Sequence, residues 1–267
     1  MKKALDGLVL REMRSGDNDR RILILTADEG KMWITAKGAR SVRSKVASVC
    51  RIFTYANLEL YEKNGAKWLS GGVINNSFSG INSDITGFAL ASYIMQITDE
   101  ITGENYPAED ILRMALNTLY AIEKKLKPYE QIKAAYELFA ANISGFMPDL
   151  DSCHSCNESD LSSSELWLDV MNGGVLCGKC LSEKSGGLPL PDTDSYEVRN
   201  ILLPLDASAL EAMRYVTHAA PQRLFAFGLS DERSMALFCR AAETYLLNHL
   251  ERDFDTLHFY NSIKEQK

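Results

Sequence analysis

The chain has 267 residues, 46% of them hydrophobic and 24% charged, with no run of about 18 apolar residues such as a membrane-spanning helix needs. The length predicts two or three domains and the composition a soluble globular protein, and no internal repeat or low-complexity tract is visible. The net charge of −7 is divided unevenly along the chain. The front of the chain, residues 1–78, has fourteen Lys and Arg and eight Asp and Glu, whereas the remaining residues have fifteen Lys and Arg and twenty-eight Asp and Glu. An anionic partner is therefore expected at the front and disfavoured elsewhere.

The front of the chain predicts five short strands. Turn-forming residues separate them at 15–19, 28–30 and 63–65, where Gly, Asp and Asn are concentrated. Five strands in about eighty residues fit a small closed barrel, most commonly the oligonucleotide-binding (OB) barrel. The predicted strands are 5–14, 21–26, 31–37, 51–61 and 67–78.

The densest cationic run of the chain lies on the third predicted strand and in the loop after it. Strand alternation places Met32, Ile34 and Ala36 inside the barrel and Trp33 outside. An exposed indole stacks on any base while nearby cations neutralise phosphates, although Trp33 packed against a neighbouring domain is the alternative. Trp68 is assigned to the core. The predicted nucleic-acid contacts are Lys31, Trp33, Lys37, Arg40, Arg43 and Lys45, widened by Arg11, Arg14, Arg20, Arg21 and Arg51.

From Asp84 onward the hydrophobic period becomes helical, with Asp84 as an N-cap. Further helices are expected to start at Pro107 and at Pro128, the latter ending near Gly145. Helical periodicity resumes over 206–219 and 230–252. The predicted α+β architecture is an OB barrel at 1–80 and a helical domain at 81–148 and 188–267, with a metal module inserted at 149–187.

The inserted module carries the strongest motif of the chain, two Cys-x-x-Cys pairs separated by twenty residues. Such pairs turn four sulfurs toward one tetrahedral ion at about 2.3 Å, and four thiolates leave no position for substrate. We therefore predict a zinc ribbon with one structural Zn²⁺. Between the pairs, 165–171 alternate like a strand and Asn172-Gly173 predicts a type I′ hairpin turn. The predicted ligands are Cys153, Cys156, Cys177 and Cys180.

An iron site and a disulfide framework are the alternatives to zinc for the four cysteines. The same sulfur set suits iron, which would make the protein a redox carrier. A disulfide framework fits small secreted domains, whereas no apolar leader follows Met1, so a reduced, cytoplasmic protein is expected. His154 is expected to be a spacer between ligands. Because 149–187 hold seven acidic and two basic residues, this module is not expected to bind nucleic acid.

Catalytic motifs are missing from the sequence. It contains no G-x-x-x-x-G-K-[ST], G-x-G-x-x-G, H-E-x-x-H or G-x-S-x-G pattern. We therefore expect a binding protein, not an enzyme. A protein-interaction adaptor whose barrel binds another polypeptide is the alternative to a nucleic-acid binder.

Several segments resemble the bacterial RecO family of DNA repair and recombination mediators. The likeness is greatest in Lys-Gly-Ala-Arg at 37–40 and extends to 16–19, 58–61 and 249–252. Many relatives carry another basic residue after that segment, whereas Ser41 stands here, which shifts the cations to Arg43 and Lys45.

The resemblance implies an OB barrel followed by a helical domain that carries a four-cysteine zinc module in many members. It also implies binding of single- and double-stranded DNA, annealing of complementary strands, and cooperation with RecR to load RecA onto DNA coated by single-stranded DNA-binding protein (SSB). The acidic tail of SSB is a further implied partner, and the expected location is the bacterial cytoplasm, at the nucleoid.

Overall fold

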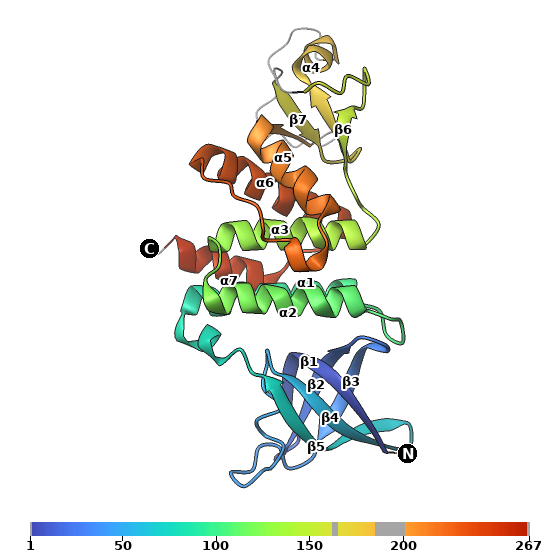
Figure 1. Cartoon of the computed structure of the whole chain (residues 1–267). Helices are drawn as coiled ribbons and strands as arrows, with labels where there is room; N and C mark the ends of the chain where they lie inside the picture. Colours follow the sequence, from blue (N-terminus) through green and yellow to red (C-terminus); the bar gives the residue numbers. More distant parts are fainter. Residues whose placement is uncertain (1, 162–164, 185–200, 266–267) are drawn as a thin grey trace. The chain divides into compact units, whose positions relative to one another are not determined.

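The computed structural model describes residues 2–161, 165–184 and 201–265. The chain forms two compact units, Met1–Leu126 with Phe254–Lys267 and Lys127–Asp253. Figure 1 shows a barrel and helices in the first unit, and helices and a small sheet in the second. None of the described helices is both long and apolar enough to cross a membrane.

A closed five-stranded barrel opens the first unit. Its strands are β1 (Lys2–Ser15), β2 (Asp19–Thr26), β3 (Gly30–Ala36), β4 (Tyr55–Lys63) and β5 (Ala66–Asn76). They follow the order β1-β2-β3-β5-β4, and β4 closes on β1. Only the β3–β5 pairing in the barrel is parallel. This arrangement confirms the predicted OB-like barrel.

The barrel interior is filled as strand alternation predicts, because Met32, Ile34 and Ala36 all belong to the buried apolar core. The predicted start of the fourth strand was wrong. Phe53 has φ 68°, a left-handed conformation that interrupts an extended strand, and its ring is buried against Phe88 with centroids 5.6 Å apart. Arg51 therefore lies in the loop before β4.

Three helices complete the first unit: α1 (Ile85–Ile101), α2 (Glu109–Lys124) and α7 (Asp255–Lys264). Asp84 caps α1 as predicted, because its carboxylate accepts hydrogen bonds from the N–H groups of Thr86 and Gly87. No helix was predicted at the position of α7.

The β2–β3 turn is tied to the connection between α1 and α2. Gly30 has φ 62°, and a Cβ atom there would lie 2.3 Å from the carbonyl oxygen of Gly103. The N–H group of Lys31 donates to the same oxygen at 3.1 Å. Glycine is therefore required at position 30, and this junction fixes the beginning of β3 against the helices.

The second unit contains α3 (Tyr129–Ile143), α5 (Ala207–His218) and α6 (Glu232–Leu250). Its four-stranded sheet has the order β6-β8-β7-β9. The short helix α4 (Gly178–Lys184) lies between β8 and β9 along the chain. The predicted end of the metal module, at 187, lies outside the described residues. The sheet strands are β6 (Asp149–Cys153), β7 (Leu166–Asp169), β8 (Gly174–Cys177) and β9 (Leu202–Leu205).

The predicted type I′ turn between β7 and β8 was wrong. Asp169 pairs with Gly174, so four residues form the connection, and of these only Gly173 has positive φ. The carboxylate of Asp169 accepts the N–H group of Asn172 at 3.1 Å and its side-chain amide at 2.8 Å. This local bonding stabilises the longer turn.

Candidate nucleic-acid interface and metal centre

Trp33 lies on the outer face of the barrel, half-buried and flanked by two arginines. Its cross-strand partner is Leu23, which in turn pairs with Arg11 on β1. The guanidinium carbon of Arg21 is 5.1 Å from the indole centroid and that of Arg11 is 6.0 Å away. Both distances fall in the range of cation–π attraction. The indole ring is thus held next to two positive charges.

Two of the predicted cations are engaged by one carboxylate of α1. Asp99 Oδ1 lies 2.9 Å from Lys31 Nζ, and Asp99 Oδ2 lies 3.2 Å from Arg11 Nη1. The side chains of Lys31 and Asp99 are only 21% and 16% exposed. These contacts hold β1 and β3 against α1, so much of the charge of Lys31 is compensated internally.

Trp68 lies on the outer face of β5, so its assignment to the core was wrong. Cross-strand pairing aligns it with Thr35 on one side and Tyr61 on the other. The Trp68 and Tyr61 rings are stacked at 17°, with centroids 6.5 Å apart, and Lys37 Nζ lies 5.8 Å from the Trp68 ring. The alternation of Trp68 with buried Leu69 was the signal that sequence reasoning missed.

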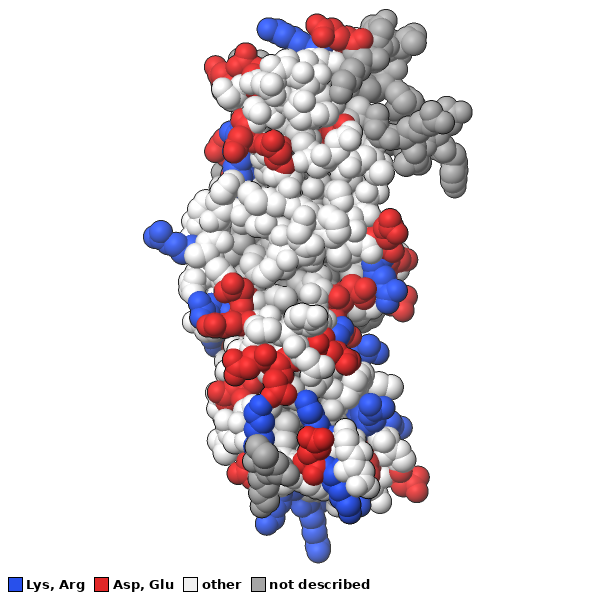
Figure 2. All heavy atoms as spheres, turned by 90° about the vertical axis from the view of Figure 1, so that its right-hand side faces the viewer, with Lys and Arg blue, Asp and Glu red and all other residues white. Residues whose placement is uncertain are grey.

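A continuous outer surface results, because Thr35 also pairs with Arg21 on β2. We call this surface the barrel face. It carries Trp33 and the stacked pair of Trp68 and Tyr61, with a cation beside each indole. Aromatic rings next to cations are the combination that suits unpaired bases and phosphates. Figure 2 shows Lys and Arg projecting from the barrel on the side drawn, interspersed with Asp and Glu. The barrel face consists of Arg21, Trp33, Thr35, Lys37, Tyr61 and Trp68.

The loop after β3 is anchored at its start, and its basic side chains beyond the anchor are exposed. Gly38 N–H donates to Asp19 Oδ1 at 2.8 Å, and Arg40 Nη1 donates to the Asp17 carbonyl at 2.7 Å. Beyond this anchor Arg43 and Lys45 are exposed, as is Arg51 at the end of the loop. No carboxylate of the described residues forms an ion pair with these last three side chains.

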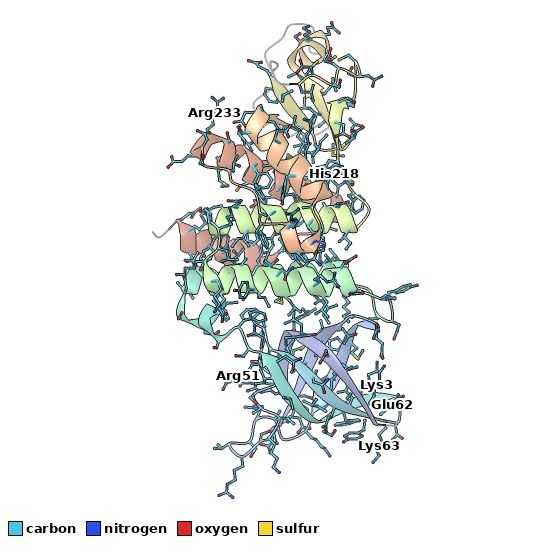
Figure 3. All side chains as sticks on the ribbon, viewed as in Figure 1. Lys3, Arg51, Glu62, Lys63, His218 and Arg233 are labelled. Atoms are coloured by element: carbon cyan, nitrogen blue, oxygen red, sulfur yellow. The ribbon has the colours of Figure 1, made fainter. Side chains whose placement is uncertain are left out.

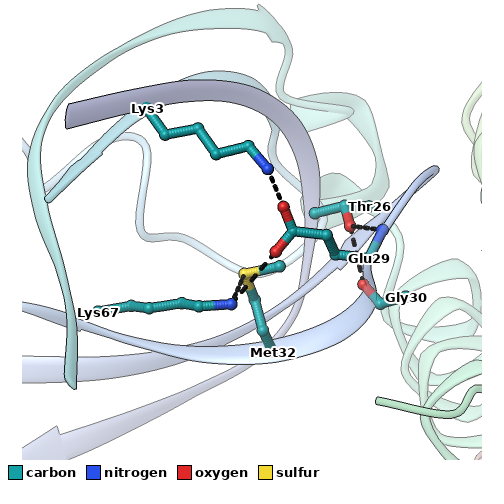
Figure 4. A network of polar contacts seen from close by, with 6 residues as sticks. All are labelled: Lys3, Thr26, Glu29, Gly30, Met32 and Lys67. Carbon is teal, nitrogen blue, oxygen red and sulfur yellow. Dashed lines mark hydrogen bonds and ion pairs between the residues drawn. The ribbon is translucent and has the colours of Figure 1, made fainter. Parts of the chain in front are cut away.

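Other basic residues of the barrel are neutralised locally. The carboxylate of Glu29 lies between Lys3 and Lys67, and Lys67 Nζ is 3.3 Å from Glu29 Oε2 and 3.4 Å from Met32 Sδ (Figure 4). Figure 3 shows Lys3 on the opposite side of the barrel from Arg51. The positive charge left without an acidic partner is therefore greater near the barrel face and the loop after β3.

Four cysteines of the second unit form a candidate metal centre. Ligands about 2.3 Å from a tetrahedral ion lie about 3.8 Å from one another. All four sulfur atoms lie within 4.8 Å of one another, and those of Cys156 and Cys177 are 3.8 Å apart. Cys153 ends β6, Cys177 ends β8 and Cys180 lies on α4, so the small sheet brings the two sequence pairs together.

The pKa values of two of these thiols are shifted in opposite directions. Burial tends to raise the pKa of Cys153, but N–H groups of Cys177, Cys156 and Ser155 donate to its sulfur and lower the pKa to about 6. The pKa of Cys180 is raised to about 12, chiefly by its hydrogen bond with Cys156. A metal ion bound here would take thiolates, so binding must release protons. The donor set fits a metal with thiolate preference.

His154 does not join this cluster. Its Nε2 atom lies 3.5 Å from Asp169 Oδ2, and its ring packs on Gly174. The cluster found among the described residues consists of the four cysteines without the histidine.

Comparison with known proteins gives matches along most of the chain. Residues 1–78 match the family model described as "Recombination protein O N terminal", and residues 82–202 match "Recombination protein O C terminal". The DNA repair protein RecO of Acetivibrio thermocellus is 26% identical over 261 residues, covering 98% of this chain and 97% of the relative. RecO of Symbiobacterium thermophilum is 26% identical over 264 residues, 98% of each chain. RecO of Anaeromyxobacter dehalogenans is 29% identical over 188 residues, 70% of this chain and 73% of the relative.

Proposed function

Because the chain belongs to the RecO family of DNA repair proteins, we propose that it is a DNA-binding recombination mediator whose barrel face holds single-stranded DNA. The observation that supports this most directly is the pairing of each outer aromatic group with a cation, Arg21 at Trp33 and Lys37 at Trp68. Bases stack on the rings while phosphates lie near the cations.

Strand annealing follows from the same surface. Two complementary strands repel each other through their phosphates, and a protein that neutralises part of that charge lets them approach. The exposed Arg43, Lys45 and Arg51 supply positive charge for a second strand or a duplex. This mechanism uses binding energy alone and involves no nucleotide hydrolysis, so the proposal assigns no catalytic residue.

Family membership is the support for the remaining partners. We propose that the protein works with RecR to load RecA onto SSB-coated DNA, that the SSB tail is a further ligand, and that the protein acts at the nucleoid. No residues are assigned to these contacts.

We propose that the four-cysteine centre holds one structural zinc ion. Four thiolates fill a tetrahedral coordination shell and leave no position for substrate. The ion would connect β6, β8 and α4, the elements that carry or adjoin its ligands. The surplus of acidic residues in 149–187 makes this module a poor surface for phosphates.

A salt titration of single-stranded DNA binding tests the proposed function. Each lost phosphate contact reduces the slope of log K against log salt by about 0.7 for single strands. The double variant Lys37→Ala, Arg43→Ala should therefore bind more weakly and reduce the slope by about 1.4. Arg233→Ala, which removes an exposed arginine on α6 (Figure 3), is a control for the loss of a positive charge outside the barrel and should behave as the unmodified protein. An unchanged slope in the double variant would refute the assignment.

A further inference from the structure

A hollow of about 280 Å³ lies at the end of the β1–β2 hairpin, separate from the aromatic groups of the barrel face. Arg14 and Arg20 face each other directly across the two strands, and Arg40 reaches the same hollow from the loop after β3. The remaining lining residues are Glu12 and Met13. Three guanidinium groups from three different segments thus meet at one place.

Local contacts hold two of these arginines and leave donors available. Arg20 Nη1 is 2.6 Å from Glu12 Oε2, and its side chain is 27% exposed. Arg40 uses Nη1 to donate to the Asp17 carbonyl. A guanidinium group has five N–H donors, so both retain several for another acceptor. Among the described residues, no carboxylate forms an ion pair with Arg14 or Arg40.

The charges of the hollow are not balanced within the protein. Three positive groups face one carboxylate, and like charges directly opposite each other on neighbouring strands are destabilising. A bound anion relieves this repulsion. Phosphate suits it best, because its oxygens match the paired N–H donors of arginine.

We infer that this hollow binds one phosphate group of a DNA strand, and that Glu12 competes with the phosphate for Arg20. The inference rests on the proposed DNA binding and adds a discrete contact to it. The competing carboxylate keeps the phosphate exchangeable, which suits a protein that must release its strands after annealing. The phosphate is either a strand terminus or an internal diester, since both present the same oxygens.

The direction in which Glu12→Gln changes DNA affinity tests the inference. Glu12→Gln removes the competitor and should tighten single-stranded DNA binding by about three- to tenfold, whereas Arg14→Gln should weaken it by a similar factor. Asp28→Asn, an exposed acid at the β2–β3 turn, is the matched control for the loss of one negative charge and should have a smaller effect. Thermal unfolding of each variant checks that the barrel remains folded.

Two further measurements complete the test. Titration with inorganic phosphate at constant ionic strength should shift the Nε–H NMR signals of Arg14, Arg20 and Arg40, while chloride should not. Tighter binding of 5′-phosphorylated than of 5′-hydroxyl oligonucleotides, abolished by Arg14→Gln, identifies a terminal phosphate, and equal binding identifies an internal one.

Unchanged DNA affinity in both Glu12→Gln and Arg14→Gln, together with unshifted arginine signals, would overturn the inference. The proposed function would still stand if Lys37→Ala, Arg43→Ala weakened binding in the same assay. It would fail separately if that double variant also bound normally.

Discussion

At the scale of single residues, the outer position of Trp33 depends on strand alternation, and this could be predicted from the sequence. The ion pairs that neutralise nearby lysines could not be predicted from the sequence. Asp99 follows Lys31 by 68 residues and Glu29 precedes Lys67 by 38, and nothing in the local sequence marks these pairs. Long-range ion pairs form only when the fold brings the residues together, so a count of basic residues overstated the charge available for DNA.

Replacement of Trp33 should measure the stacking contribution. Trp33→Ala is expected to weaken single-stranded DNA binding by about 1–3 kcal/mol, because base–aromatic stacking contributes this much per base. Trp33→Phe should retain most of the affinity. Fluorescence anisotropy with a labelled oligonucleotide gives the measurement.

Tyr120→Ala is a suitable control for this experiment. Tyr120 is 48% exposed on α2 and has Lys124 Nζ 5.9 Å from its ring, so it is an aromatic–cation pair away from the barrel strands. Equal losses in the Trp33 and Tyr120 variants would show that the barrel face has no special part in binding.

At the scale of elements, the sequence predicted the five barrel strands and five of the helices, because their hydrophobic periods are long and regular. It failed where one residue adopts a special conformation or where an element is short. Phe53 interrupts the fourth predicted strand through its positive φ, although phenylalanine favours extended structure. The four-residue strand β9 and the helix α7 lack a pattern long enough to distinguish them from loops.

Gly30 provides an element-level test of the junction between the barrel and the helices. Gly30→Ala should reduce the free energy of unfolding by clearly more than the 1–2 kcal/mol that a left-handed alanine costs, because the new Cβ atom would meet the Gly103 carbonyl. Gly16→Ala, also at positive φ but with no atom within 4 Å, should cost only about 1–2 kcal/mol. Chemical denaturation compares them, and equal losses would contradict a tight junction.

Removal of the metal should affect the second unit alone. Cys177→Ser or a chelator is expected to remove one zinc ion per chain and to lower the unfolding temperature of Lys127–Asp253, while DNA affinity of the barrel is unchanged. Zinc affinity should fall as the pH is lowered, because protons compete for the thiolates. Elemental analysis and a visible spectrum distinguish zinc from iron.

Cys239→Ser is the control, since Cys239 lies on α6 and outside the four-cysteine cluster. It should retain the metal. Full metal retention by Cys177→Ser, or a loss of DNA binding on metal removal, would contradict a purely structural zinc ion.

At the scale of the whole molecule, the division of charge along the sequence agrees with the two proposed roles, DNA binding by the barrel and metal binding by the second unit. Residues 1–78 carry the positive surplus and the aromatic barrel face, and the acidic remainder contains the metal centre. In the proposed function, this division would attract nucleic acid to the basic part of the chain and repel it from the rest. The total charge of −7 alone would have predicted the opposite behaviour.

Photochemical cross-linking of single-stranded DNA that contains 5-iododeoxyuridine, with the attached peptides identified by mass spectrometry, tests the central claim most directly. We predict cross-links to Trp33, Trp68 or Tyr61 on the barrel face, which disappear at high salt. Cross-links confined to residues 127–253, with none in the barrel, would contradict the account.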